Sequence, residues 1–333
     1  GSFALPATGL HNSLYTAKTS IRDNDLTRLM SNNSVSYKIS KDVVYNGGIS
    51  FDYTMNSYKG FNDAVHGDGV GVGGSASASV SRNFNYVAQN SIDYRLALGE
   101  NHKFDFKGLI EFQQNKLNFI SASGEVMPIG FTNVANAAAN KDASSSFDDW
   151  SNLSYLGIVN YKFQDRFLLD LTARREGSSR FSEATRWGNF YSAGAAWNID
   201  KESFMKNVTF VDLLRLRGSY GTTGNNAIGL NEFQTLLGTS SYNNKGGMFP
   251  SQFGTTGLTW EIQNKFDAGV EFGLFNNRIT GSVAYYNNDS NDLLLSLPMS
   301  LTTGHSSQTQ NLGTLTNKGL EFELDLDLIR SDN

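Results

Sequence analysis

Alternation of apolar and polar residues is the dominant pattern along this chain. In residues 320–328, five apolar residues alternate with four carboxylates: Leu320, Phe322, Leu324, Leu326 and Leu328 against Glu321, Glu323, Asp325 and Asp327. Because successive side chains of a β-strand point to opposite faces, this segment would have one apolar face and one acidic face. The same division recurs in four further segments: 92–98, 104–112, 167–174 and 266–274. The pattern predicts an all-β protein whose strands each have an apolar and a polar face.

The connections between these segments alternate in length. Tight turns are predicted at four places: 40–42, 99–102, 164–165 and 276–277. Long polar connections fall between them at 57–76, 114–150, 177–187, 221–258 and 291–312, and a connection of middling length lies at 199–211. Regular alternation of short and long connections is typical of transmembrane β-barrels. Several segments also exceed the 9–11 residues that a strand needs to cross a bilayer.

The sequence therefore predicts an antiparallel transmembrane β-barrel, of which about 12 strands are present. Their expected ranges are 12–21, 33–40, 43–56, 77–98, 103–120, 151–163, 166–176, 188–198, 212–221, 259–275, 278–291 and 309–328. Aromatic residues near strand ends are expected to form the interfacial girdles of such a barrel. The candidates are Tyr161, Phe163, Phe167, Trp187, Tyr191, Trp197 and Phe275.

Composition excludes several classes of function. The net charge of -5 offers no basic surface for nucleic acid, and no apolar run approaches the length of a membrane helix. The chain has no cysteine, which excludes disulfides, thiolate metal sites and a cysteine nucleophile. The first residues, Gly1 to Pro6, lack the basic and apolar regions of a signal peptide.

No catalytic site, metal site or cofactor is predicted. The glycine-rich segment 67–74 resembles a phosphate-binding loop in composition, but an alternating segment rather than a helix follows it, so a flexible outer loop is expected. His305 precedes two serines, which would suit a hydrolase only if a carboxylate oriented the histidine. His11, His66 and His102 are scattered without metal spacing.

The expected ligand contacts lie in the long connections and at the adjoining strand ends. Aromatic side chains there could stack on a sugar or a peptide, with polar neighbours as hydrogen-bonding groups. The candidates are Trp150, Tyr242, Phe249 and Trp260, with Asp148, Asp149 and Asn225 beside them. Packing within the loops, or a place in the aromatic girdle, is the alternative role for these residues.

Several motifs resemble those of SusC-like (SusC/RagA) TonB-dependent transporters of the Bacteroidetes outer membrane. They are DRFLLD (165–170), RREGSSRF (174–181), WG (187–188), SAGAAWNI (192–199), LRLRGSYGTTGN (214–225), LTWE (258–261), FDAGVE (266–271) and NKGLE (317–321). The likeness covers roughly residues 150–330 by motif and the earlier part by pattern alone.

The resemblance implies a 22-stranded barrel, an N-terminal plug that contacts TonB, and a SusD-like surface lipoprotein as partner. It further implies active import of oligosaccharides or oligopeptides across the outer membrane. Residues 1–333 would all belong to one barrel domain in contact with outer-membrane lipid. Plug sequence and enough strands to close the barrel are absent, so both are expected elsewhere in a longer polypeptide. The alternatives are a passive porin and a structural barrel subunit of a larger outer-membrane complex.

Overall fold

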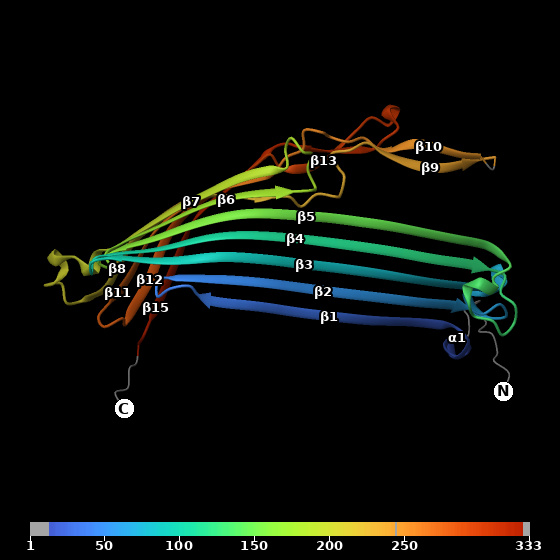
Figure 1. Ribbon diagram of the computed structural model, residues 1–333, viewed down its shortest axis with the longest axis horizontal. Coiled ribbons are helices and arrows are strands. Elements are labelled where there is room, and N and C mark those ends of the chain that lie inside the picture. The colour runs from blue at the N-terminus through green and yellow to red at the C-terminus, as the bar shows by residue number, and fades with distance from the viewer. Residues whose placement is uncertain (1–12, 244, 329–333) are drawn as a thin grey trace. The chain divides into compact units, whose positions relative to one another are not determined.

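The computed structural model describes residues 13–243 and 245–328, which are mainly antiparallel β-strands (Figure 1). A short helix, α1 (Ser13–Thr19), comes first. In the described part, one sheet contains eleven strands: β1 (Ile21–Lys38), β2 (Val43–Asn62), β3 (Ser75–Leu98), β4 (His102–Glu125), β5 (Ala139–Phe163), β6 (Phe167–Ser178), β7 (Trp187–Asn198), β8 (Val211–Asn225), β11 (Glu261–Leu274), β12 (Ile279–Asn291) and β15 (Thr314–Leu326). They lie in chain order, so the predicted antiparallel β fold is confirmed.

Two long connections contain further strands, which form separate hairpins. The connection from β8 to β11 contains β9 (Leu236–Tyr242) and β10 (Lys245–Gln252). The connection from β12 to β15 contains β13 (Leu294–Pro298) and β14 (Ser307–Asn311). Short 3-10 helices occupy other connections: η1 (Gly67–Val72), η2 (Val134–Asn136), η3 (Ile199–Lys201), η4 (Ser203–Met205) and η5 (Leu301–Thr303).

The described chain divides into two compact units. The first comprises residues 13–33, Ile49–Val87 and Gln113–Trp150, and the second comprises Ser34–Gly48, Ala88–Phe112 and residues 151–328. In the second unit, the tight turns lie at one end of the strands, and the two hairpins lie beyond the other end (Figure 1). Short and long connections are thus separated there, as the sequence predicts.

Left-handed backbone conformations close the tight turns that follow β5 and β11. Gln164 and Asp165 both have φ of 52°, and Asn276 and Asn277 have φ of 59° and 56°. Asn and Asp tolerate this region better than most residues, which is why they recur at these positions. All four predicted tight turns separate consecutive strands of the sheet.

Several of the predicted strands differ from the structure. Residue 12 lies outside the described part, and the rest of the predicted strand 12–21 is largely the helix α1, whose Tyr15 packs its ring 4.3 Å from that of His66. This tertiary contact overrides the weak local pattern. The predicted strand 309–328 is two strands, because Gly313 has φ of 81° and separates β14 from β15. Strand β1 also begins at Ile21, well before the predicted residue 33. Strand β5 begins at Ala139 rather than at 151, so much of the predicted long connection 114–150 belongs to β4 and β5.

Register in the second unit keeps the two faces separate across neighbouring strands. Leu216 of β8 lies opposite Val270 of β11, which lies opposite Val283 of β12, and Val283 lies opposite Phe322 of β15. One residue further along β11, Glu271 lies opposite Arg215. Apolar residues therefore share one face of the sheet and charged residues share the other.

The buried apolar cores lie in the long connections and at the strand ends that adjoin them. In the second unit, Phe181, Phe190, Ile228, Leu258 and Trp260 form one cluster. In the first unit, Phe61, Ala76, Met127 and Ala137 form another. The described helices are too short and too polar to cross a membrane.

Candidate functional site

The apolar face of the second unit is exposed over its whole described width. In the row that runs from β8 to β15, the exposed fractions are 45% for Leu216, 37% for Val270, 41% for Val283 and 68% for Phe322. A soluble protein rarely exposes so continuous an apolar surface. Such a face is typical of the lipid-contacting side of a transmembrane β-barrel.

Aromatic rings line the turn end of the second unit. Tyr161, Phe163, Phe167 and Trp197 lie near one another, with ring centroids of Phe163 and Phe167 6.3 Å apart and those of Phe167 and Trp197 5.9 Å apart. His102 joins them, because its Nδ1 lies 2.8 Å from the Tyr161 hydroxyl. Of the other predicted girdle residues, Phe275 stacks on Phe210, Trp187 stacks on Tyr155, and Tyr191 is 60% exposed. Their role as girdles remains a prediction.

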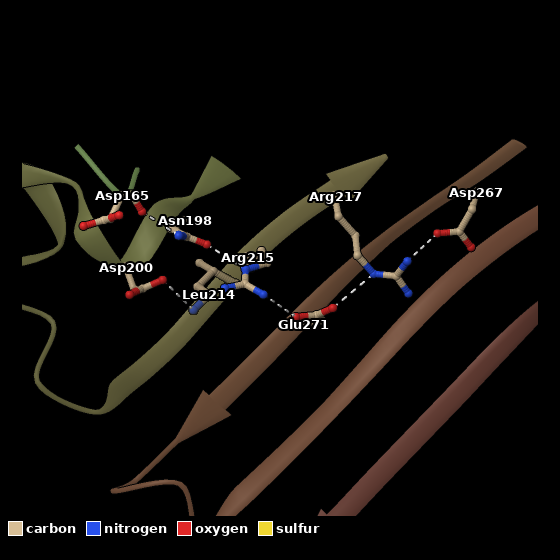
Figure 2. A network of polar contacts seen from close by, with 8 residues as sticks. All are labelled: Asp165, Asn198, Asp200, Leu214, Arg215, Arg217, Asp267 and Glu271. Atoms are coloured by element: carbon tan, nitrogen blue, oxygen red, sulfur yellow. Dashed lines mark hydrogen bonds and ion pairs between the residues drawn. The ribbon is translucent and has the colours of Figure 1, made fainter. Parts of the chain in front are cut away.

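The opposite face carries a ladder of charged residues across β8 and β11 (Figure 2). Glu271 lies between two guanidinium groups, 3.4 Å from Nη1 of Arg215 and 3.1 Å from Nε of Arg217. Arg217 also forms an ion pair with Asp267. Because each charge has a partner of opposite sign, the ladder joins the two strands without giving the face a large net charge.

The ladder continues to the turn before β6 through Asn198. Its Oδ1 accepts a hydrogen bond from Nε of Arg215 at 2.7 Å, and its Nδ2 donates to the backbone carbonyl of Asp165 at 2.6 Å (Figure 2). Nearby, the Asp200 carboxylate accepts a hydrogen bond from the backbone N–H of Leu214 at 3.3 Å. These contacts fix the turn end of the charged face.

Glu202 ties the connection after β7 to the same turns. Its carboxylate accepts hydrogen bonds from Nε of Arg166 at 3.0 Å and from Nε1 of Trp197 at 2.9 Å. The hydrogen bond from Arg166 and, to a smaller extent, the one from Trp197 hold the pKa of Glu202 below its usual value, because both bind the charged form. The carboxylate therefore stays ionised although only 6% of the residue is exposed.

A recess of about 580 Å³ lies farther along the charged face of the second unit. Its lining includes Asp170 and Arg174 of β6 and Lys265 of β11, with small residues of β7 and β8 between them. Nη2 of Arg174 lies 2.7 Å from the Glu176 carboxylate and 3.0 Å from the Ser154 hydroxyl. The recess thus presents charges of both signs, hydroxyl groups and peptide backbone.

The predicted ligand contacts do not form one cluster within either unit. In the first unit, Asp148, Asp149 and Trp150 follow one another on β5, and the Asp149 carboxylate accepts hydrogen bonds from Nε2 of Gln114 at 2.9 and 3.1 Å. In the second unit, Tyr242 is 87% exposed and Phe249 is 48% exposed on the β9 and β10 hairpin. Their role in ligand binding remains a prediction.

Trp260 and Asn225 lie close together in the second unit but make internal contacts. Trp260 is only 3% exposed, and its indole N–H donates to the Arg186 carbonyl at 3.0 Å. Its ring centroid lies 5.3 Å from that of Phe181 and 5.5 Å from that of Phe190. The Asn225 side chain accepts a hydrogen bond from the backbone N–H of Ala227. Loop packing, the alternative role, is what these contacts support.

Two motifs that suggested chemistry have structural roles. The segment 67–74 contains the 3-10 helix η1, in which Gly69 is buried so closely that a Cβ there would lie 2.3 Å from the Asp63 carbonyl. This compact fold replaces the expected flexible loop. His305 packs its ring 4.2 Å from that of Phe253, and its side chain donates no hydrogen bond to a described carboxylate.

Sequence reasoning did not single out the residues that line the recess. Alternation placed Asp170 and Arg174 on the polar face but gave them no special role. The available signal was the block of small residues at polar positions of β7 and β8: Ser192, Gly194, Ser219 and Gly221. Small residues on neighbouring strands indicate a depression only when the register is known.

An antiparallel sheet with one exposed apolar face and one charged face defines the wall of a β-barrel. A family model described as "TonB dependent receptor-like, beta-barrel" matches residues 3–331, and the chain belongs to this family. It is 34% identical over 272 residues to TonB-dependent receptor P26 of Formosa agariphila, covering 79% of the chain and 28% of that relative. It is 38% identical over 185 residues to TonB-dependent receptor SusC of Bacteroides thetaiotaomicron, covering 52% of the chain and 18% of SusC.

Solved structures agree with this assignment. The structure of the RagAB peptide transporter matches with a TM-score of 0.87 and 25% identity, covering 95% of the chain and 36% of the matched chain. The siderophore receptor PiuA of Acinetobacter baumannii matches with a TM-score of 0.52 and 13% identity, which is a likeness of fold alone. The chain spans roughly a third or less of the length of the curated relatives, at 28%, 26%, 32% and 18%.

Proposed function

We propose that this chain forms part of the wall of an outer-membrane transporter. The observation that carries the proposal is the exposed apolar row of Leu216, Val270, Val283 and Phe322, with the charged ladder on the opposite face. In a closed barrel the apolar face would contact outer-membrane lipid and the charged face would line the interior. All of residues 1–333 would then belong to one transmembrane barrel domain.

The remainder of a 22-stranded barrel and its plug would come from other parts of a longer polypeptide. An open sheet edge in lipid would leave backbone N–H and C=O groups without partners, so further strands must pair with β1 and β15. The lengths of the curated relatives support this, since the chain covers only 28% of receptor P26.

The transport activity that we infer is TonB-dependent active import of oligosaccharides or oligopeptides, in partnership with a SusD-like surface lipoprotein. The likeness to SusC and to the RagAB peptide transporter supports this inference. In this role the plug would block the barrel until TonB, acting through the plug, opens a path for the substrate. The family consists of receptors rather than enzymes, and no enzymatic activity is proposed.

The test is uptake by cells that produce the full-length protein. Uptake of labelled oligosaccharides or oligopeptides should require both this protein and TonB, and should fall when the SusD-like lipoprotein partner is removed. A passive porin or structural barrel subunit is the alternative. Steady ion conductance of the purified protein in planar bilayers, or uptake that persists without TonB, would favour the porin.

A further inference from the structure

The recess on the charged face has a floor of small side chains. Ser192 and Gly194 of β7 lie opposite Gly221 and Ser219 of β8, so four small residues form a block across the two strands. A Cβ added to Gly221 would lie 2.8 Å from the Ser192 Cβ, which shows how closely the floor is packed there. The block leaves space above it for a ligand that lies across the strands.

Charged side chains stand on either side of this floor. Asp170 of β6 lies opposite Gly194, and Lys265 of β11 lies opposite Gly221. Both Asp170 and Lys265 line the recess, and neither side chain forms a hydrogen bond or an ion pair with another described residue. The recess thus has one available carboxylate and one available ammonium group, on opposite sides.

Arg174 supplies hydrogen-bond donors at the same recess. Its charge is offset by Glu176, so the pair adds little net charge. Its Nε is buried and has no hydrogen-bond partner among the described residues. Hydroxyl groups of Thr172, Ser192 and Ser219 add donors and acceptors along the lining.

The spacing of the two available charges sets the length of a matching ligand. Strands β6 and β11 are separated by three inter-strand intervals, or about 14 Å. Asp170 and Lys265 are also offset by two residues along the strands, so their backbones lie about 16 Å apart, a distance that the two side chains themselves partly span. An extended peptide rises about 3.3 Å per residue, so about four residues would reach from one side to the other. The α-ammonium of such a peptide would bind Asp170 and its α-carboxylate would bind Lys265.

A neutral oligosaccharide fits these features less well. Sugar binding usually relies on exposed aromatic rings as stacking surfaces. The lining of the recess includes three aromatic residues. Tyr191 and Tyr220 are exposed, but the register places them on the apolar face. Phe190, on the charged face, is 6% exposed and packs against Trp260. A neutral sugar would also leave Asp170 and Lys265 without opposite charges.

From these observations we propose that the recess binds a short oligopeptide with free termini, held between Asp170 and Lys265. This inference rests on the proposed import function and names peptides as its substrate class. The recess lies toward the ends of the strands that adjoin the long connections, since its lining reaches Glu176 and Gly224. A peptide that enters from that end would meet the recess before the charged ladder.

The test is direct binding to the purified full-length protein in detergent, measured by calorimetry. The probes are tetraalanine with free termini, the same peptide acetylated at its N-terminus, the same peptide amidated at its C-terminus, and maltotetraose. Free tetraalanine should bind at least tenfold more tightly than each of the other three. Equal or tighter binding of maltotetraose would overturn the proposal.

Two single-residue variants assign each peptide terminus. Asp170→Asn should weaken binding of the free peptide and remove the effect of acetylation, while the effect of amidation persists. Lys265→Ala should remove the effect of amidation and preserve that of acetylation. If both variants bind all peptides as the unmodified protein does, the proposal is wrong.

A matched pair of glycine variants tests the position of the ligand. Gly194→Leu fills the recess, and its Cβ would lie 3.7 Å from the nearest atom, so the fold should tolerate it. Gly218→Leu makes the same change on the apolar face with the same clearance of 3.7 Å. Gly194→Leu should weaken tetraalanine binding at least tenfold and Gly218→Leu should leave it unchanged.

The outcomes separate this inference from the proposed transport function. TonB-dependent uptake together with peptide binding that Gly194→Leu does not affect would overturn the recess proposal alone. Peptide binding that Gly194→Leu blocks, in a protein whose uptake does not need TonB, would overturn the transport proposal alone.

Discussion

The indole N–H of Trp197 donates to Oε1 of Glu202 at 2.9 Å, so the end of strand β7 is joined to the connection that follows it. Arg166, in the turn before β6, binds the same carboxylate. The Trp197 ring also stacks beside that of Phe167. One carboxylate thus holds two turns and an aromatic ring in place at this end of the second unit.

Acid should weaken this junction. Hydrogen bonds from Arg166 and then Trp197 lower the pKa of Glu202, so its contribution to stability is complete above the ordinary value of about 4.3. That contribution is lost as pH falls through the lower pKa of the folded state. The thermal midpoint of the full-length protein in detergent should therefore decrease more between pH 5 and pH 3 than that of Glu202→Gln. Equal decreases would contradict this role.

A lysine on the apolar face should destabilise the protein far more than one on the charged face. Val283→Lys would place its charge toward lipid, at a cost of about 2–4 kcal/mol near the bilayer centre. Ser282→Lys, at the same depth, would lie between Glu271 and Glu323 and should cost little. Denaturant unfolding in lipid vesicles measures the free energy of unfolding of both variants. Similar costs for the two variants would argue against a lipid-facing apolar side.

Trp260 should matter to stability through packing. Trp260→Ala would leave a cavity beside Phe181 and Phe190 and should cost about 3–5 kcal/mol. Trp260→Phe keeps a ring but loses the hydrogen bond to Arg186, and should cost about 1 kcal/mol from that loss. Unfolding curves of the two variants show whether Trp260→Ala loses more stability than Trp260→Phe. A stable Trp260→Ala protein with weakened ligand binding would instead support a binding role.

The Arg217 and Asp267 ion pair should contribute modestly. Their side chains are 39% and 31% exposed, so solvent screens part of the attraction. A double-mutant cycle of Arg217→Met and Asp267→Asn should give a coupling energy of about 0.5–1 kcal/mol. Raising the salt concentration should reduce that value. Zero coupling at low salt would show that Arg217 acts through Glu271 alone.

The strands were predictable because two independent signals agreed. In β15, Leu320 to Leu326 alternate with carboxylates, and in β11 the alternation of Phe266 to Leu274 is almost as regular. The tight turn at Asn276 and Asn277 marks where one strand ends and the next begins. Local patterns of this kind predict structure well because neighbours in sequence are also neighbours in the sheet.

The contents of the long connections were not predictable in the same way. The β9 and β10 hairpin joins Leu236 to Gln252 through a polar segment without clear alternation. The helix α1 and the segment 67–74 depend on contacts with residues that are distant in sequence, such as the hydrogen bond from the Val126 N–H to the Gly74 carbonyl. The recess likewise depends on register, because Gly194 and Gly221 adjoin the same floor only when three strands pair as they do.

The core around Trp260 draws Phe181 from the connection between β6 and β7, and Ile228 and Leu258 from the connection between β8 and β11. Leu294, in the connection between β12 and β15, packs against it. A change in the size of one member must be matched by changes in the others, because they share one packed volume. The effect of a substitution in one of these connections should therefore depend on the residues present in the others. A loop grafted singly from a relative should function poorly, whereas the loops that share this core should be transferable as a set.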